Sequence, residues 1–449
     1  MTRIIPGVEI QVVKEIVPRI LNPSGVVAMI GTAEKGPILT TVHVSSYQEF
    51  AEKFGSDPSY TLVKDAKQAF QNGVFEIVAV RVAGAGGKKA SITLKDKEGK
   101  DALTLTAVDE GQAGNEIEVG VEPGSTEDTF NLTIKYGRVI ETYTDVSMNP
   151  KHEKYVVNEI NKKSTLVKAS IVKPATKNVL AEFKGKLSGG KDPGEPGIKD
   201  FEEALEKLEA EPDVDVVLAC NSTNPEIHAK IDAHCKVMSK DAMGRIGIGS
   251  VAKGESIDDM IKKTEKLKSD RFVLVAPFGV AGAVAGLISN LNYYESPTFK
   301  PLAGVFELER QFTPSQLRQL LKAGILPVVA QKERGIIVVK GITTSGEQIS
   351  VIRVVDRAVR GVNSIAADFI GTLNNESSRL ALKQKITWFL SRMESEGALV
   401  PSVDSQEPAF MVDVYSTKLD FAQGIVRVDL AVRPVRAIDY IYATLLVQI

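Results

Sequence analysis

Residues 214–276, VDVVLACNSTNPEIHAKIDAHCKVMSKDAMGRIGIGSVAKGESIDDMIKKTEKLKSDRFVLVA, decide the fold class of this chain. Three short runs within them, residues 214–220, 246–251 and 272–276, are almost wholly apolar, which is typical of strands buried on both faces of a sheet. The two stretches between these runs are long enough for helices and have helical periodicity. This alternation of strands and helices predicts a mainly parallel sheet with helices on both faces.

Capping residues predict where the helices of this region begin. The pairs are Asp200 with Glu203, Asn224 with Pro225, Ser256 with Asp259, and Thr313 with Pro314. Residues 280–291 are rich in small side chains and predict a further, closely packed helix. Upstream, residues 26–31 and 75–82 read as strands that bracket helices at 46–54 and 61–72. We therefore assign residues 23–89 and 188–345 to one α/β core domain.

Residues 90–187 have a different pattern and predict an inserted antiparallel β domain. Short alternating runs at 91–94, 102–106, 116–121, 129–136, 139–146 and 166–172 are separated by turn signals, with one helix near 153–160. Glycine-rich stretches at 84–87 and 188–197 flank this region, as expected for an insertion.

The C-terminal part predicts an α+β domain over residues 346–432. A strand at 336–342 precedes a helix at 354–370, and Asn375 caps a long amphipathic helix that ends near Glu396. Residues 409–415 and 425–432 predict a β-hairpin. The fold class is thus α/β with a β insertion and an α+β C-terminal domain.

Composition excludes several classes of function. The 55 basic residues nearly cancel the 57 acidic ones, so no net field draws the chain to nucleic acid or to an anionic membrane. Residues 272–294 are interrupted by Pro277 and predict a buried strand and helix, not a membrane span. The first 18 residues lack the apolar core of a signal peptide, and two cysteines make no disulfide framework, so a reducing compartment is expected.

Known catalytic and nucleotide-binding motifs are incomplete in this sequence. Residues 31–36, GTAEKG, lack the Gly-Lys-Ser/Thr ending of a P-loop, and Gly279, Gly282 and Gly286 lack the spacing of a dinucleotide fingerprint. Packing of a small-residue helix accounts for these glycines better. His228 and His234 lie six residues apart on one helix, so they cannot share a metal. We expect no catalytic residue, cofactor or metal.

Two alternative functions nevertheless stay open. An α/β enzyme could use the crevice near Cys220, Asn221, Pro277 and Phe278, because the carboxyl ends of parallel strands are a usual ligand site. Cys220 and Cys235 are more simply explained as small hydrophobic residues in the core. An adhesin built on the β insertion is a third possibility, and it would require that domain to bind a ligand in isolation.

The two ends of the chain are physically unusual. The last ten residues, 440–449, carry no charge, proline or glycine, and an open edge of this kind would aggregate unless it were covered. This segment is either an internal strand of its own domain or a strand that pairs with an arm from a neighbouring copy. Residues 8–13 alternate apolar and polar side chains and could be that arm. Exchange at both ends would build filaments or stacked rings.

Several motifs resemble those of contractile tail sheath proteins. They are PGVEI at 6–10, GVVAMIGTAEKGP at 25–37, Phe50 with Phe54 and Gly55, AFQNG at 69–73, VRV at 80–82, AGNEIEV at 113–119, FNLTI at 130–134, RPVRAIDYI at 433–441 and LVQI at 446–449. Their order and spacing extend over nearly the whole chain.

The resemblance implies a subunit that polymerises as stacked hexameric rings around an inner tube and contracts to drive the tube through a target envelope. Its partners would be other copies, the tube protein, and baseplate and tail terminator proteins. Assembly would occur in the bacterial cytoplasm, and the product would be a virion tail or a contractile injection particle. No binding of nucleic acid and no direct insertion into a membrane is implied.

The same resemblance assigns roles to both ends, as a linker arm over residues 1–22 and a linker strand over residues 433–449. The strand-exchange residues would be Val8, Glu9, Ile10, Gln11, Val12, Val13, Tyr440, Ile441, Tyr442, Leu445, Leu446 and Val447. Hinges are expected at Pro18, Pro23, Arg433 and Pro434. The β insertion would face outward, and the C-terminal domain would face the tube.

Overall fold

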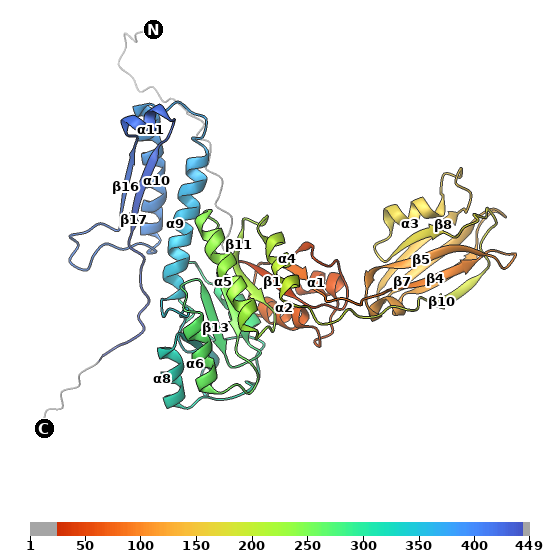
Figure 1. Ribbon diagram of the computed structural model, residues 1–449, viewed down its shortest axis with the longest axis horizontal. Coiled ribbons are helices and arrows are strands. Elements are labelled where there is room, and N and C mark those ends of the chain that lie inside the picture. The colour runs from red at the N-terminus through yellow and green to blue at the C-terminus, as the bar shows by residue number, and fades with distance from the viewer. Residues whose placement is uncertain (1–24, 443–449) are drawn as a thin grey trace, which may run out of the picture. The chain divides into compact units, whose positions relative to one another are not determined.

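The computed structural model describes residues 25–442 (Figure 1). Contacts divide the chain into two compact units. One contains Gly25–Asp356 together with the chain from Arg436 onward, and the other contains Arg357–Val435. The fold is mixed α/β with several sheets.

The first unit is built on an eight-stranded sheet with the order β15-β14-β13-β12-β11-β1-β3-β2. Its six central strands are parallel to one another: β1 (Val26–Gly31), β3 (Glu76–Arg81), β11 (Val214–Ala219), β12 (Ile246–Ser250), β13 (Phe272–Ala276) and β14 (Ile325–Gln331). The edge strands β2 (Thr41–Val44) and β15 (Gly335–Val338) are antiparallel to β3 and β14. The predicted parallel sheet is confirmed.

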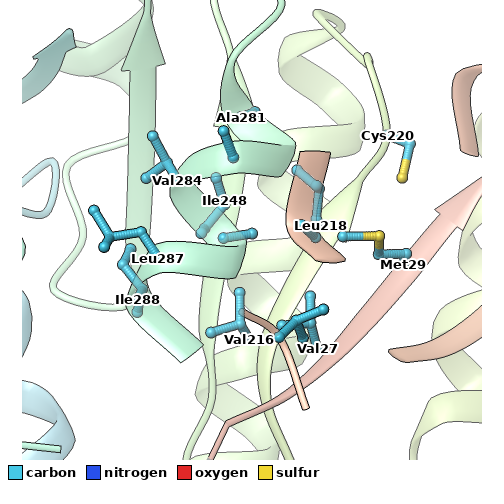
Figure 2. Close-up of a cluster of buried hydrophobic side chains, with 14 of the residues drawn as sticks. Val27, Met29, Val216, Leu218, Cys220, Ile248, Ala281, Val284, Leu287 and Ile288 are labelled. Atoms are coloured by element: carbon cyan, nitrogen blue, oxygen red, sulfur yellow. The ribbon is translucent and has the colours of Figure 1, made fainter. Parts of the chain in front are cut away.

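Helices cover both faces of this sheet. They are α1 (Tyr47–Phe54), α2 (Thr61–Gln71), α4 (Ile198–Leu208), α5 (Pro225–Lys240), α6 (Ile257–Lys266), α7 (Ala281–Asn290) and α8 (Pro314–Lys322). Since successive strand residues point to opposite faces, the sheet has two hydrophobic cores. Buried residues of α1, α2 and α7 belong to one core, and those of α4, α5, α6 and α8 to the other. Figure 2 shows strand residues of the first core, including Val27, Val216 and Leu218, near Ala281, Val284 and Leu287 of α7.

Helix capping follows the sequence at three of the four predicted sites. Asn224, Ser256 and Thr313 are the N-caps of α5, α6 and α8. The prediction that Asp200 caps a helix is wrong. The N-cap is Gly197, and the Asp200 carboxylate, one turn inside α4, accepts a hydrogen bond of 2.7 Å from the Gly197 amide. A carboxylate in the first turn serves the same unpaired amides and interacts favourably with the helix dipole.

The glycines of α7 allow close contact between two helices, as the sequence predicted. A Cβ atom at Gly282 would lie 2.5 Å from the carbonyl oxygen of Asp65, and one at Gly286 would lie 2.5 Å from that of Ala69. Both carbonyls belong to α2. The small side chains of α7 are therefore a packing requirement of this helix pair.

Replacing Gly286 with alanine should lower the free energy of unfolding by about 1–3 kcal/mol, because α2 or α7 must move to make room. Gly120→Ala is a matched control, since its new methyl group would have only the Thr133 Cβ at 4.0 Å. Urea denaturation of both variants measures the difference. Equal stability of the two variants would contradict the close α2–α7 contact.

The edge strand β2 has a polar contact that depends on pH. His43 lies between two carboxylates, with Nδ1 2.6 Å from Glu76 and Nε2 3.1 Å from Glu211. The hydrogen bond to Glu76 raises the pKa of His43; partial burial opposes this effect, and Glu211 adds to the rise. Protonated His43 thus ties β2 to β3 and to the segment before β11.

This contact predicts the sign of a pH effect. A histidine whose pKa is raised by folding stabilises fully below its unfolded pKa of about 6.5, and the stabilisation disappears as pH rises through the folded pKa. His43→Gln should therefore cost stability at pH 6 and none at pH 9. Because the side chain is half exposed, the cost should be below about 1 kcal/mol. Denaturant unfolding at the two pH values checks this, and a larger loss at pH 9 would contradict it.

Residues between β3 and α4 form two antiparallel sheets with a hydrophobic core of their own. One sheet has the order β4-β5-β9 and the other β10-β6-β7-β8. The strands are β4 (Lys89–Lys95), β5 (Asp101–Glu110), β6 (Glu118–Pro123), β7 (Phe130–Tyr136), β8 (Val139–Val146), β9 (Val167–Ile171) and β10 (Phe183–Lys186), with the 3-10 helix η1 (Gln112–Glu116) and α3 (Val156–Lys163).

The second unit contains most of the long helix α9 (Ile349–Ala367) and all of α10 (Glu376–Ser395), β16 (Phe410–Tyr415), α11 (Lys418–Ala422) and β17 (Arg427–Val432). Asn375 caps α10, and β16 and β17 pair as an antiparallel hairpin, so both predictions are confirmed. The inward residues predicted for α10, such as Leu382 and Phe389, are buried. None of the helices described here is long and apolar enough to span a membrane.

Candidate assembly surfaces

The predicted site residues lie at the two ends of the chain, and only some have a described position. Val8, Glu9, Ile10, Gln11, Val12, Val13, Pro18, Pro23, Leu445, Leu446 and Val447 lie outside the described residues. Tyr440, Ile441, Tyr442, Arg433 and Pro434 lie within them. The strand-exchange and hinge roles of both groups stay predictions.

The described part of the C-terminal segment is strongly exposed. Tyr440, Ile441 and Tyr442 expose 67%, 86% and 93% of their surface, and none of them is in a strand. Three consecutive large hydrophobic residues in this state are a liability for a free chain. Up to Tyr442, therefore, the segment does not form an internal strand of its own domain, which was the simpler of the two expectations.

Just upstream, residues 433–435 are bound to the second unit. The Arg433 amide donates to the Ala409 carbonyl at 2.9 Å, and the Val435 amide donates to the Ala398 carbonyl at 2.9 Å. The Arg433 guanidinium also pairs with Glu407. The predicted hinge residues thus belong to the end of the hairpin, and the chain passes to the first unit between Val435 and Arg436.

The hairpin β16–β17 has two open edges. Each strand pairs only with the other among the described strands, and no residue of either strand is fully buried. In the connection between the two strands, Asp420 of α11 accepts two hydrogen bonds of 2.8 Å from Arg427, the first residue of β17. These bonds hold the pKa of the Asp420 carboxyl well below its usual range. A two-stranded sheet of this kind is marginal alone and offers backbone groups to further strands.

The same unit exposes large apolar side chains on its helices and the adjoining turn. Trp388 on α10, the single tryptophan of the chain, is 58% exposed. Ile370, Leu373, Leu419 and Phe421 are each more than half exposed. Trp388 is not among the residues predicted for the inward face of α10. Its exposure could therefore have been inferred from the sequence.

Among the residues of the enzyme alternative, Cys220 belongs to the hydrophobic core, whereas Asn221 and Phe278 are half-buried. Cys220 is buried, and burial together with the neighbouring Asp65 raises the pKa of its thiol well above the ordinary value. Asp65 is also buried, which raises its pKa to about 6, and it accepts a hydrogen bond of 2.8 Å from the Asn221 amide. A buried, protonated thiol is a poor nucleophile. The geometry favours packing, as the sequence also suggested for both cysteines.

The two helix-borne histidines are held by separate structural contacts. His228 Nε2 donates to the Ser222 carbonyl at 3.0 Å, and His234 Nε2 lies 2.8 Å from the guanidinium of Arg245. Burial lowers the pKa of both histidines to about 4, with a further contribution from Arg245 at His234. Within residues 25–442, no group of three or more His, Cys, Asp or Glu side chains could hold a metal ion.

A pocket of about 430 Å³ lies between α5 and α6. Its lining includes Asn224, His228, Lys263 and Leu267. Lys263 is paired with Glu255 at 2.7 Å, and His228 is bound as described above. Asn224, His228 and Lys263 of this pocket are thus engaged in contacts that stabilise the fold.

Comparisons with known proteins add a family match to one region of the chain and a similarity of fold. Residues 194–344 match the family model of the phage tail sheath protein central domain. No curated protein matches the sequence. Among solved structures, the sheath tail protein of Listeria innocua is similar, with 15% identity, a TM-score of 0.72, and coverage of 92% of this chain and 93% of that one.

Other solved structures share the fold. The sheath tail protein of Desulfitobacterium hafniense has 17% identity and a TM-score of 0.66, covering 91% of this chain and 93% of its own. The sheath of PVC, an extracellular contractile injection system, in its contracted state has 12% identity and a TM-score of 0.60, covering 99% and 98%. At these identities the likeness is one of fold.

Proposed function

Because the resemblance to contractile tail sheath proteins is confirmed, with residues 194–344 matching the central domain of that family, we propose that this chain is the structural subunit of a contractile sheath. The observation that carries the proposal is the family match within a fold shared over more than nine tenths of the chain. The similar solved structures include a contracted sheath.

In this function the subunit polymerises as stacked hexameric rings around an inner tube and contracts to drive the tube through a target envelope. Its partners are other copies of the chain, the tube protein, and baseplate and terminator proteins. The work needs no nucleotide, because an extended lattice can store energy that is released when subunits bury more surface on contraction. The assembled sheath is part of a virion tail or of a contractile injection particle.

Strand exchange links neighbouring subunits in this proposal. The exposed residues Tyr440–Tyr442 begin an uncharged segment that is part of no strand of its own body as far as it is described. The open edges of β16 and β17 are places where strands from neighbours can continue a sheet. Residues 8–13 supply a second alternating segment for the same pairing. Persistent strand pairs would keep the lattice connected while the bodies rotate about hinges near Pro18, Pro23, Arg433 and Pro434.

The domain assignments carry over to the assembly. The β insertion, residues 90–187, faces outward, and the C-terminal domain, residues 346–432, faces the tube. The exposed Trp388 and the other exposed apolar side chains of the C-terminal domain support an assembly surface there.

Negative-stain electron microscopy of the purified chain, at high concentration and at two salt strengths, tests this function. Hollow tubes with a helical repeat are the expected result. If only small particles form, the cognate tube protein is added to nucleate assembly. Small particles in its presence would contradict the proposal.

A further inference from the structure

The segment just before the exposed C-terminal residues is held tightly against its own body. Gln348 makes three hydrogen bonds to this segment. Its side-chain oxygen accepts from the Ala437 amide at 2.9 Å, and its side-chain nitrogen donates to the Ala437 carbonyl at 3.1 Å and to Asp439 Oδ2 at 2.8 Å. Lys340 Nζ lies 3.2 Å from Asp439 Oδ2 and 3.3 Å from the Tyr440 hydroxyl. Arg436 pairs with Glu347 at 3.0 Å.

The loop that makes these contacts is rigidly built into the sheet. Val339 N donates to the Pro327 carbonyl of β14 at 2.9 Å, and Gly341 N donates to Thr298 Oγ1 at 3.0 Å. The hydroxyl of Thr344 donates to the Leu267 carbonyl at 2.6 Å. Gln348 is 6% exposed and directly precedes α9. A force applied to Ala437 or Asp439 therefore reaches the parallel sheet through short, buried connections.

The charges of the contact are partly shielded from water. The side chains of Lys340 and Asp439 are 20% and 11% exposed. Partial burial lowers the pKa of Lys340, but the hydrogen bonds to Tyr440 and Asp439 outweigh it and raise the pKa above its ordinary value. The lysine thus stays charged, and its ring contact with Tyr440, 5.0 Å from Nζ to the centroid, adds a cation–π interaction.

The burial of this segment ends abruptly after Asp439. Asp439 is enclosed, whereas Ile441 and Tyr442, two and three residues later, are almost fully exposed. We propose that Lys340, Glu347 and Gln348 form a clamp that fixes the point at which the exchanged C-terminal segment leaves its own subunit. Building on the proposed strand exchange, the clamp carries the pull of the neighbouring subunit into the sheet of the donor.

The clamp also sets the reach of the segment. With residues 436–440 held, the nine residues 441–449 can span at most about 30 Å. Release of residues 436–440 would add about 16 Å of slack. A lattice that must transmit rotation from ring to ring needs the shorter, fixed connection.

Hydrogen exchange at the Ala437 amide in the unpolymerised chain tests the clamp directly. Gln348→Ala and Asp439→Ala should each speed this exchange by about tenfold or more, because each removes at least one hydrogen bond of the clamp. Ile438→Ala is the matched control, since Ile438 is 80% exposed in the same segment. In this variant the exchange rate of the Ala437 amide should stay within about twofold of the wild-type rate. The double variant Lys340→Asp, Asp439→Lys should restore part of the protection. Unchanged protection in Asp439→Ala would overturn the clamp.

Assembly of the same variants tests what the clamp does. Asp439→Ala should form tubes whose mean length is reduced severalfold, whereas Ile438→Ala should form normal tubes. Lost protection at Ala437 with tubes of normal length would overturn the role in assembly. A wild-type chain that never forms tubes would reject the proposed function instead, while the exchange measurement would still decide whether the clamp exists.

Discussion

Deleting residues 1–18 should abolish ordered tubes while leaving a folded body. The deletion removes Val8, Ile10 and Val12, the apolar side chains of the predicted exchange arm. Without the arm, an open sheet edge in each neighbour stays unpaired, and contacts between bodies alone must hold the lattice. Negative-stain electron microscopy of the truncated chain, under conditions in which the full chain assembles, measures the effect.

Two controls separate loss of assembly from loss of folding. The circular dichroism spectrum and thermal midpoint of the truncated chain should match those of unpolymerised full-length protein. A triple substitution of Val8, Ile10 and Val12 by serine keeps the length of the arm and should also prevent tubes. Tubes of normal length and order from the truncated chain would refute strand exchange through the N-terminal arm.

Removing residues 443–449 should have an effect of similar size at the other end. The truncated chain keeps the clamp residues up to Tyr440 but loses Leu445, Leu446 and Val447. Because exchange of both ends is head to tail, a subunit that accepts a strand without donating one stops growth at its position. The truncated chain alone should form no tubes.

A mixture makes this prediction quantitative. One truncated subunit per ten full-length subunits should shorten the tubes severalfold, which light scattering and electron microscopy can follow. The same amount of extra full-length chain is the control and should leave the tube length unchanged. If the singly truncated chain leaves tube length unchanged, the C-terminal segment is not an exchanged strand.

The parallel sheet could be predicted because its central strands are continuous apolar runs. Strands β12 and β13 are buried along their full length, and β11 is buried everywhere except at Asp215, so their continuous apolar runs are typical of central parallel strands. The strand β14 was not predicted, because Pro327 interrupts ILPVVAQ and proline lacks the amide that a central strand usually donates. Pro327 still takes part in the sheet region through its carbonyl, which accepts a hydrogen bond from the Val339 amide.

Short or polar elements were also missed. The strand β2 has only four residues, TVHV, with a half-exposed histidine, and this is too short for an alternating pattern to identify it. The helix α11 has five residues, which is too few for a periodic pattern, although Thr417 caps it. Helix α9 begins at Ile349, five residues before the predicted start, since helix ends are set by local contacts.

The candidate site was predictable only in part. The uncharged C-terminal segment stands out in the sequence, and its described residues are as exposed as an exchanged strand requires. The clamp had no such signal. Gln348 and Asp439 are ordinary polar residues 91 positions apart, and only the folded loop after β15 brings them together. Sequence patterns report local periodicity, whereas this contact depends on the tertiary structure.

Helical reconstruction of assembled tubes by electron cryomicroscopy tests the central claim most directly. The account predicts hexameric rings in which residues 8–13 and 441–447 of each subunit pair with strands of neighbouring subunits, while residues 436–440 stay bound to Lys340, Glu347 and Gln348 of their own chain. Tubes in which both terminal segments fold back onto their own subunit, or discrete closed oligomers in place of tubes, would contradict it.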